Sequence, residues 1–319
     1  MRAIWSFWSR PHDLFYHRYW HSARTHCLSW ALSLGEAERH YVDTCLFADE
    51  AGATLLVDRL GLPFRHVDTS LEVLNREGTD PQWWVLGKLS AYAAQTEPFV
   101  HLDADVILWK PLPAWLEATP VFAQNPEHFE FEDQSLYRAD GFMRAMAELG
   151  GWLPEEWYLY AEQRRNAALC CGILGGTDVA FLRRYASLAI DIIRHPQNAV
   201  VWERLNVRDN ILVEQYFLAA CLEVSAKRRQ ARGADPVTLG IECLFPSSAH
   251  AFDPAEAERA GYTHLIGDAK ADPAIAARLE ARVRSAHPAL YERCVSFCAE
   301  SVKRAAYARM PSPVGEWEE

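Results

Sequence analysis

Two aspartates, Asp103 and Asp105, stand one residue apart near the end of an apolar run that begins at Pro98. Charges inside an apolar strand are costly unless a cation compensates them. Residues i and i+2 of an extended chain point to the same side, so both carboxylates can face one ligand. Two hard oxygen donors at this spacing suit a divalent cation, Mn²⁺ or Mg²⁺. The alternative is a strand end whose two acids are only solvated.

A second group of chemically capable residues lies far downstream, in the pattern His264-x-x-Gly267-x-x-Lys270. An imidazole added to carboxylates favours Mn²⁺ over Ca²⁺. Gly267 lets backbone amides approach a phosphate closely, and Lys270 offers a point charge for a diphosphate. This pattern is weak by itself, and only its combination with the upstream Asp-x-Asp makes it specific.

Alternating apolar strands and amphipathic helices must position these groups. The strands are expected at residues 3–8, 42–49, 63–68, 120–124, 168–176 and 240–245, with one more carrying Asp103 and Asp105. The helices are expected at residues 15–35, 50–61, 83–95, 179–193 and 207–222, and a basic loop at 227–233. This alternation predicts an α/β fold with a mostly parallel sheet and helices on its faces. The two aspartates then lie at the carboxyl edge of the sheet, where such folds bind ligands.

The composition excludes several classes of protein. The chain has 319 residues and a net charge of −11, so it lacks the basic surface of a nucleic-acid-binding protein. The sequence contains no stretch of 18 uncharged apolar residues, so no transmembrane segment is predicted. The N-terminus lacks the apolar core of a signal peptide. The eight cysteines show no zinc-like pairing. A cytoplasmic location is therefore expected.

Residues 99–112, which include Asp103 and Asp105, resemble the Asp-x-Asp strand of nucleotide-sugar glycosyltransferases with the GT-A fold. Within that fold they are most similar to glycosyltransferase family 8 and related sugar-binding-region families. The resemblance implies a GT-A, Rossmann-like, mostly parallel sheet flanked by helices, with a C-terminal helical extension. It implies His264 as the third metal ligand, and Gly267 and Lys270 as phosphate contacts.

Three further residues acquire roles only through this resemblance. Lys88 matches a basic residue that contacts the donor, and Glu214 and Gln215 match an Asp-Gln pair beside the acceptor and the reacting centre. Residues 170–174 loosely match a strand of the Asn-Ala-Gly-Val type, with Cys170 in the place of the Asn. The donor-binding residues are then Lys88, Asp103, Gly267 and Lys270, the metal ligands Asp103, Asp105 and His264, and the catalytic residues Glu214 and Gln215.

The implied activity is metal-dependent transfer of a hexose from a nucleotide-diphosphate-sugar, a UDP-sugar above all, to an acceptor hydroxyl with retention of configuration. The acceptor is open: a glycan, a protein, a peptide or a lipid-linked molecule. Two alternatives stand beside this interpretation. One is a catalytically inactive nucleotide-sugar-binding protein, and the other is a nucleotidyltransferase or phosphohydrolase on a similar sheet.

The simplest division of the chain has two parts. Residues 1–272 are expected to form the GT-A-like catalytic domain, and residues 273–319 a C-terminal helical extension with a mobile tail. Residues 125–165 are rich in aromatic and acidic side chains. They predict an insertion on the acceptor side or, equally, a helical surface layer.

Overall fold

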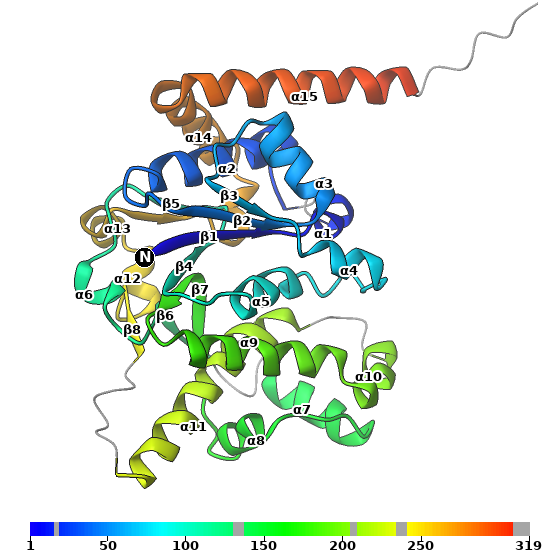
Figure 1. Cartoon of the computed structure of the whole chain (residues 1–319), viewed down its shortest axis with the longest axis vertical. Coiled ribbons are helices and arrows are strands. Elements are labelled where there is room, and N and C mark those ends of the chain that lie inside the picture. The colour runs from blue at the N-terminus through cyan, green and yellow to red at the C-terminus, as the bar shows by residue number, and fades with distance from the viewer. Residues whose placement is uncertain (16–18, 130–136, 205–208, 234–240, 309–319) are drawn as a thin grey trace, which may run out of the picture.

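A seven-stranded sheet with helices on both faces organises the computed structural model, which describes residues 1–15, 19–129, 137–204, 209–233 and 241–308 (Figure 1). The strand order is β3-β2-β1-β4-β7-β6-β8. Every neighbouring pair is parallel except the two that involve β7, which runs against both β4 and β6. The predicted fold class, an α/β fold with a mostly parallel sheet flanked by helices, is confirmed. The strands are β1 (Arg2–Phe7), β2 (Thr44–Ala48), β3 (His66–Asp68), β4 (Phe99–Leu102), β6 (Val121–His128), β7 (Ala167–Gly176) and β8 (Ile241–Cys243).

The two faces of the sheet bury two separate hydrophobic clusters. Along β1, Trp5 packs with the cluster that includes Leu32, whereas its neighbour Ile4 packs with the cluster that includes Leu89. Successive strand residues point to opposite faces, and both faces are covered, so the strands read as nearly continuous apolar runs. In Figure 1, α2 (Ala23–Ala37), α14 (Pro273–Ala286) and α15 (Pro288–Ala308) lie on one side of the sheet, and α5 (Val85–Ala93), α9 (Val179–Arg194) and α11 (Phe217–Ala231) on the other.

The remaining helical segments are short. They are α1 (Ser9–Phe15), α3 (Glu50–Ala53), α4 (Glu72–Arg76), α6 (Ala114–Glu117), α7 (Ala139–Glu148), α8 (Glu155–Ala161), α10 (Ala199–Arg204), α12 (Ser248–Phe252) and α13 (Pro254–Ala260). Among the described residues, two segments are π-helical, η2 (Thr54–Arg59) and η4 (Leu212–Tyr216), and two are 3₁₀ turns, η3 (Pro196–Asn198) and η6 (Gly267–Lys270). In the part of the chain that is described, no helix is both long and apolar enough to cross a membrane.

A second, two-stranded sheet brings distant parts of the chain together. Strand β5 (Val106–Leu108) pairs antiparallel with β9 (Tyr262–His264), and Val106 lies opposite His264. This pairing joins the segment after the Asp-x-Asp motif to the segment that carries the late histidine. It is the element of the fold that assembles the site described below.

Several predicted element boundaries are wrong. The helix expected over 15–35 is α2, which begins only at Ala23 and continues past Gly35 to Ala37. The strand expected over 120–124 continues to His128. The basic stretch 227–233 is largely helix, because α11 continues to Ala231. Its cations have acidic partners there: Lys227 lies 2.8 Å from Glu223 one turn earlier, and Arg228 lies 2.9 Å from Glu156. Such pairs support a helix. The mobile tail predicted at residues 310–319 lies outside the described residues.

Candidate active site

The Asp-x-Asp motif forms a turn, not a strand. Strand β4 ends at Leu102 and β5 starts at Val106, so Asp103 and Asp105 lie between them. The turn is closed by the amide of Val106, which donates to the carbonyl of Asp103 at 2.9 Å. The expectation that an extended chain aligns the two side chains is therefore wrong. Their place at the carboxyl end of a central strand is confirmed.

Neighbouring elements hold the backbone of this turn. The amide of Asp103 donates to the carbonyl of Gly172 on β7 at 3.0 Å. From α2, the hydroxyl of Ser29 donates to the carbonyl of Ala104 at 2.7 Å, and that of Ser33 to the carbonyl of Asp103 at 3.4 Å. The two serine hydroxyls thus donate hydrogen bonds to turn carbonyls that are not paired in a β-sheet. The turn is fixed from two sides before any ligand binds.

His264 reaches the turn through the β5–β9 pairing. Its Nε2 lies 3.6 Å from Oδ1 of Asp105, and the backbone is tied by the amide of Leu265, which donates to the carbonyl of Asp105 at 2.9 Å. Ligand atoms of Asp103, Asp105 and His264 all lie within 4.8 Å of one another. Two carboxylates and one imidazole are a donor set that suits Mn²⁺ and also accommodates Mg²⁺. The residues present fit a divalent cation.

Two lysines compensate the carboxylates. Nζ of Lys88, on α5, lies 3.0 Å from Oδ1 of Asp103, and Nζ of Lys270 lies 2.5 Å from Oδ2 of Asp105. Burial alone would raise the pKa of Asp105, but Lys270 and His264 hold that pKa below its usual range. Burial raises the pKa of Asp103, and Lys88 opposes the shift. Lys270 and His264 thus favour the ionised form of Asp105, and Lys88 favours that of Asp103 against the effect of burial.

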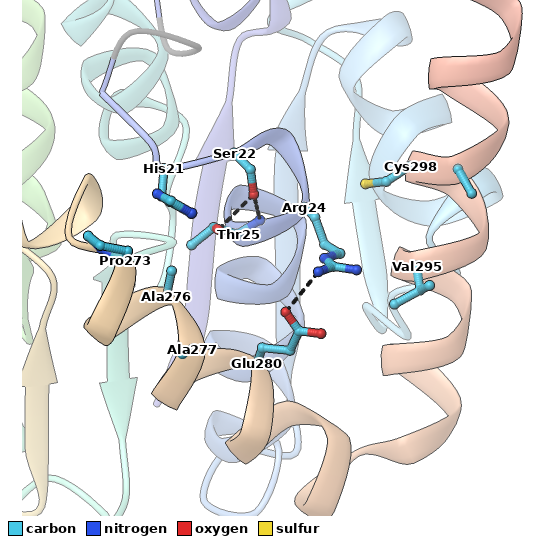
Figure 2. Close-up of a pocket in the computed structure, with 11 residues that line it drawn as sticks. His21, Ser22, Arg24, Thr25, Pro273, Ala276, Ala277, Glu280, Val295 and Cys298 are labelled. Carbon is cyan, nitrogen blue, oxygen red and sulfur yellow. Dashed lines mark hydrogen bonds and ion pairs between the residues drawn. The ribbon is translucent and has the colours of Figure 1, made fainter.

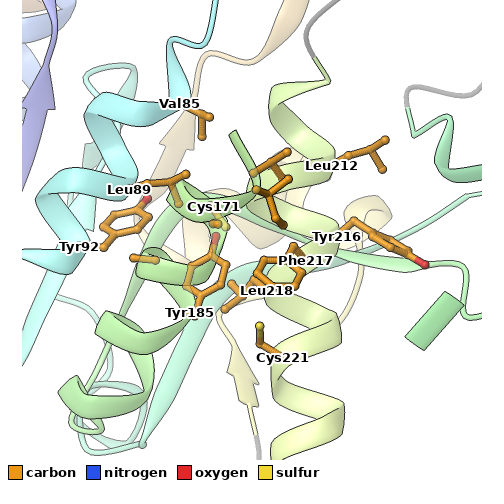
Figure 3. Close-up of a cluster of buried hydrophobic side chains, with 14 of the residues drawn as sticks. Val85, Leu89, Tyr92, Cys171, Tyr185, Leu212, Tyr216, Phe217, Leu218 and Cys221 are labelled. Carbon is orange, nitrogen blue, oxygen red and sulfur yellow. The ribbon is translucent and has the colours of Figure 1, made fainter. Parts of the chain in front are cut away.

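Glu214 lies behind this layer, on η4. Its side chain is fully buried, and its Oε1 lies 2.8 Å from Nζ of Lys88 and accepts from the hydroxyl of Tyr92 at 3.2 Å. The hydroxyl of Tyr185 donates to the backbone carbonyl of Glu214 at 2.7 Å. Burial, together with the charge of Asp103, raises the pKa of Glu214 despite Lys88. Figure 3 shows the apolar cluster that encloses this region, with Tyr92, Cys171, Tyr185 and Phe217 turned toward one another from four elements.

Gln215, the next residue of η4, is only half-buried. Its Oε1 accepts a short hydrogen bond from the hydroxyl of Tyr137, which also contacts Glu127 of β6. The side chain is therefore held at the edge of the open space in front of the lysines. A π-helical turn that carries functional side chains is a recurring feature of such sites.

One cavity of about 640 Å³ unites these groups. All eight residues predicted from the sequence line it: Lys88, Asp103, Asp105, Glu214, Gln215, His264, Gly267 and Lys270. Aromatic side chains near the N-terminus, including Trp8, Trp20 and Trp30, also line the cavity. Of the described part of 125–165, Glu127 alone lines the cavity, and Tyr137, Trp157 and Tyr160 are buried in the core instead.

The site also contains a residue that the sequence interpretation missed. Gln124 of β6 is 2% exposed, and its Oε1 lies 2.8 Å from Nδ1 of His264. The sequence does offer one indication of this residue, because Gln124 is a polar amide that directly follows the apolar residues Val-Phe-Ala of a predicted strand. A buried polar side chain needs hydrogen-bond partners, and this one finds them in the site.

A second cavity of about 500 Å³ lies between α2, α14 and α15 (Figure 2). Its charged groups, Arg24 and Glu280, form an ion pair at 3.1 Å, and its wall is otherwise formed mainly by small and apolar side chains. None of the eight predicted residues lines it. The chemically capable groups are concentrated in the first cavity.

Comparisons with known proteins give one family and 87 similar chains among solved structures. Residues 1–297 match a family model described as "Family of unknown function (DUF6734)". No curated protein sequence matches the chain. Among solved structures, the galactosyltransferase LgtC in complex with donor and acceptor sugar analogues is 13% identical, with a TM-score of 0.41 and coverage of 89% of this chain and 96% of that one. An active-site mutant of LgtC is 12% identical, with a TM-score of 0.38 and coverage of 83% and 86%.

Proposed function

The chain belongs to DUF6734, a family of unknown function, and we propose that it is a metal-dependent glycosyltransferase. It would transfer a hexose from a nucleotide-diphosphate-sugar, most simply a UDP-sugar, to an acceptor hydroxyl with retention of configuration. One observation carries the proposal. Asp103, Asp105 and His264 converge within 4.8 Å, with Lys88 and Lys270 beside them, on the wall of a cavity of about 640 Å³. A divalent cation flanked by ammonium groups can bind a diphosphate and neutralise its charge.

The roles follow from the chemistry of each group. A divalent cation held by Asp103, Asp105 and His264 would neutralise charge on the departing diphosphate. Lys270 is 20% exposed and can leave Asp105 for a phosphate oxygen. Gly267 has a φ of +57°, and a Cβ added to it would meet no described atom within 4 Å, so its backbone is open to a phosphate. These three features support binding of the diphosphate along β9 and η6.

The two catalytic candidates, Gln215 and Glu214, differ in solvent exposure, and we assign them different roles. Gln215 is half-buried at the cavity edge, and its side-chain amide can reach a sugar in the open space. Glu214 is fully buried, and its Oε1 accepts from Lys88. We therefore assign Gln215 to the reacting centre, and we assign Glu214 to fixing the ammonium of Lys88. The family resemblance implies that both residues are catalytic, whereas this assignment gives the catalytic role to Gln215 and a positioning role to Glu214.

A panel of nucleotide-sugars with Mn²⁺ tests the proposal. Slow hydrolysis of the donor, without any acceptor, is expected for at least one UDP-hexose and should depend on the metal. Asp105→Ala should abolish that hydrolysis and the metal-dependent binding of UDP. An exposed acid away from the site, Glu148 on α7, provides the matched control Glu148→Ala, which should leave both unchanged.

The same panel separates the alternatives. A catalytically inactive binder takes up Mn²⁺ and nucleotide but releases no UDP from any donor. A phosphohydrolase or a nucleotidyltransferase instead breaks the P–O–P bond of the donor, so it releases a sugar 1-phosphate in place of free sugar and UDP, with UMP as the second product when water is the acceptor. Absence of both donor binding and turnover across the panel contradicts the proposal.

A further inference from the structure

The buried amide of Gln124 bridges two residues of β9. Its Oε1 accepts from the hydroxyl of Tyr262 at 2.6 Å and lies 2.8 Å from Nδ1 of His264. Gln124 and Tyr262 are each 2% exposed, so water does not compete for these bonds. A carbonyl oxygen has two lone pairs and can accept both bonds at once. The amide oxygen can therefore accept a bond from Nδ1–H of His264 in addition to the one from Tyr262.

This arrangement determines which imidazole nitrogen carries the proton. A neutral histidine has one ring N–H and one free lone pair, and the bond made by one nitrogen decides the state of the other. When Nδ1–H donates to Oε1 of Gln124, the lone pair is on Nε2. Nε2 is the nitrogen that faces the carboxylates, at 3.6 Å from Oδ1 of Asp105.

We propose that Gln124 is a positioning residue that holds His264 in its Nδ1–H form and so presents the Nε2 lone pair to a divalent cation between Asp103 and Asp105. The inference rests on the metal site of the proposed function and adds a residue to it. Gln124 acts only through His264. Such outer partners orient metal-binding histidines and increase their basicity.

The local backbone of β6 supports this contact. Strand β6 has an irregular register against β7 between Ala123 and Asn125, which is where Gln124 stands. A bulge re-aims a side chain that regular alternation would direct elsewhere. The main chain of Gln124 is anchored as well, because its carbonyl accepts from the amide of Phe245 at 2.9 Å. The bulge and this anchor direct the amide toward β9.

Gly172 on β7 completes the arrangement. A Cβ at this position would lie 2.3 Å from Oε1 of Gln124 and 2.6 Å from both Nδ1 and Cε1 of His264. Any side chain there would separate the amide from the imidazole. The glycine is therefore required by the close approach of the two groups and not by its backbone angles.

The first experiment measures the affinity of the full chain for Mn²⁺ alone, by calorimetry and electron paramagnetic resonance, with no nucleotide present. Gln124→Leu removes the acceptor, and we expect the dissociation constant for Mn²⁺ to rise about 10- to 100-fold. Gln124→Glu keeps an acceptor for both donors and should bind Mn²⁺ at least as tightly as the native chain. Tyr262→Phe, a matched control, removes the other bond of the same oxygen and should change the affinity less than about threefold.

The second experiment determines by NMR which ring nitrogen of His264 carries the proton. In ¹⁵N-histidine-labelled, metal-free protein, with His264 assigned by His264→Gln, the native chain and Gln124→Glu should show the Nδ1–H form. Gln124→Leu should show a mixture or the Nε2–H form. An Nε2–H form in the native chain overturns the proposal, because the amide would then donate to Nδ1 instead of accepting. Equal losses of Mn²⁺ affinity in Gln124→Leu and Tyr262→Phe also overturn it. Neither experiment uses a sugar donor, so a failure here is distinct from a failure of the glycosyltransferase proposal.

Discussion

Lys270 and Asp105 form an ion pair at 2.5 Å in the middle of the candidate metal site. The ammonium therefore occupies one carboxylate oxygen that a divalent cation would use. A cation that enters alone must compete with Lys270, whereas a cation that enters with a diphosphate offers the ammonium a phosphate oxygen in exchange. From this relationship we expect metal binding and donor binding to be cooperative.

Lys270→Met should therefore change two affinities in opposite directions. The affinity for Mn²⁺ alone is expected to rise about tenfold, or ~1.4 kcal/mol, because a competing positive charge is removed. The affinity for UDP at saturating Mn²⁺ is expected to fall by a similar factor, because a phosphate contact is lost. Calorimetric titrations with Mn²⁺ and then with UDP measure both.

Lys227→Met on α11 is the matched control, since Lys227 is an exposed lysine paired with Glu223 outside the cavity. It should alter neither affinity. If Lys270→Met instead weakens both Mn²⁺ and UDP binding, Lys270 supports the fold of the site and does not exchange between partners.

Lys88 is the cation on which two buried carboxylates depend. It lies 3.0 Å from Asp103 and 2.8 Å from Glu214, and only 11% of its side chain is exposed. Lys88→Met leaves both acids without compensation, and we expect the free energy of unfolding to fall by about 3–5 kcal/mol. In a Glu214→Gln background the same substitution should cost clearly less, because one of the uncompensated charges is gone.

Urea unfolding of the four proteins in this cycle gives the coupling energy between Lys88 and Glu214. A coupling energy near zero contradicts the assignment of Glu214 as the partner that fixes Lys88. Added Mn²⁺ should partly restore the stability of Lys88→Met, since the cation also compensates Asp103.

Glu214 also predicts a dependence of stability on pH. Burial raises its pKa in the folded state above the ordinary value of 4.5. The folded chain then binds the proton more tightly than the unfolded chain does. The stabilisation is complete below the unfolded pKa and is lost as the pH rises through the folded pKa.

In Glu214→Gln this contribution is absent. The free energy of unfolding of the native chain minus that of Glu214→Gln should therefore fall as the pH rises through the unfolded pKa, and it should level off once the folded pKa is passed. Urea unfolding over a series of closely spaced pH values measures the difference. A difference that rises with pH shows that the ion pair with Lys88 outweighs burial and that the pKa is lowered instead.

The sequence could predict the members of the site but not their arrangement. Asp103, Asp105 and His264 stand in short patterns whose residue types already indicate metal ligands. Their geometry depends on the pairing of Val106 with His264, which is a contact between distant segments. The sequence therefore suggested a strand through the two aspartates where the chain turns. Gln124 was missed for a related reason, because the register shift in β6 that directs it leaves no pattern in the residues around it. At residues 227–231 the sequence shows the basic side chains and the local partner of Lys227, Glu223, but it does not show the pairing of Arg228 with Glu156, which lies far away in the sequence.

Gly172→Ala tests whether close packing, and not only the proposed ligand residues, maintains the candidate metal site. The added methyl group would lie 2.3 Å from Oε1 of Gln124 and 2.6 Å from Nδ1 of His264, so one of them must move. We expect the affinity for Mn²⁺ to fall at least about tenfold, because the imidazole loses its orienting bond or its place beside Asp105. Gly141→Ala in α7 is the matched control, since no described atom lies within 4 Å of its Cβ position and alanine favours a helix by roughly 0.5–1 kcal/mol over glycine. That variant should be slightly more stable and should bind Mn²⁺ as the native chain does. If Gly172→Ala keeps native affinity for Mn²⁺ while it loses stability, the packing of β7 against β9 serves the core and the imidazole is oriented by other means.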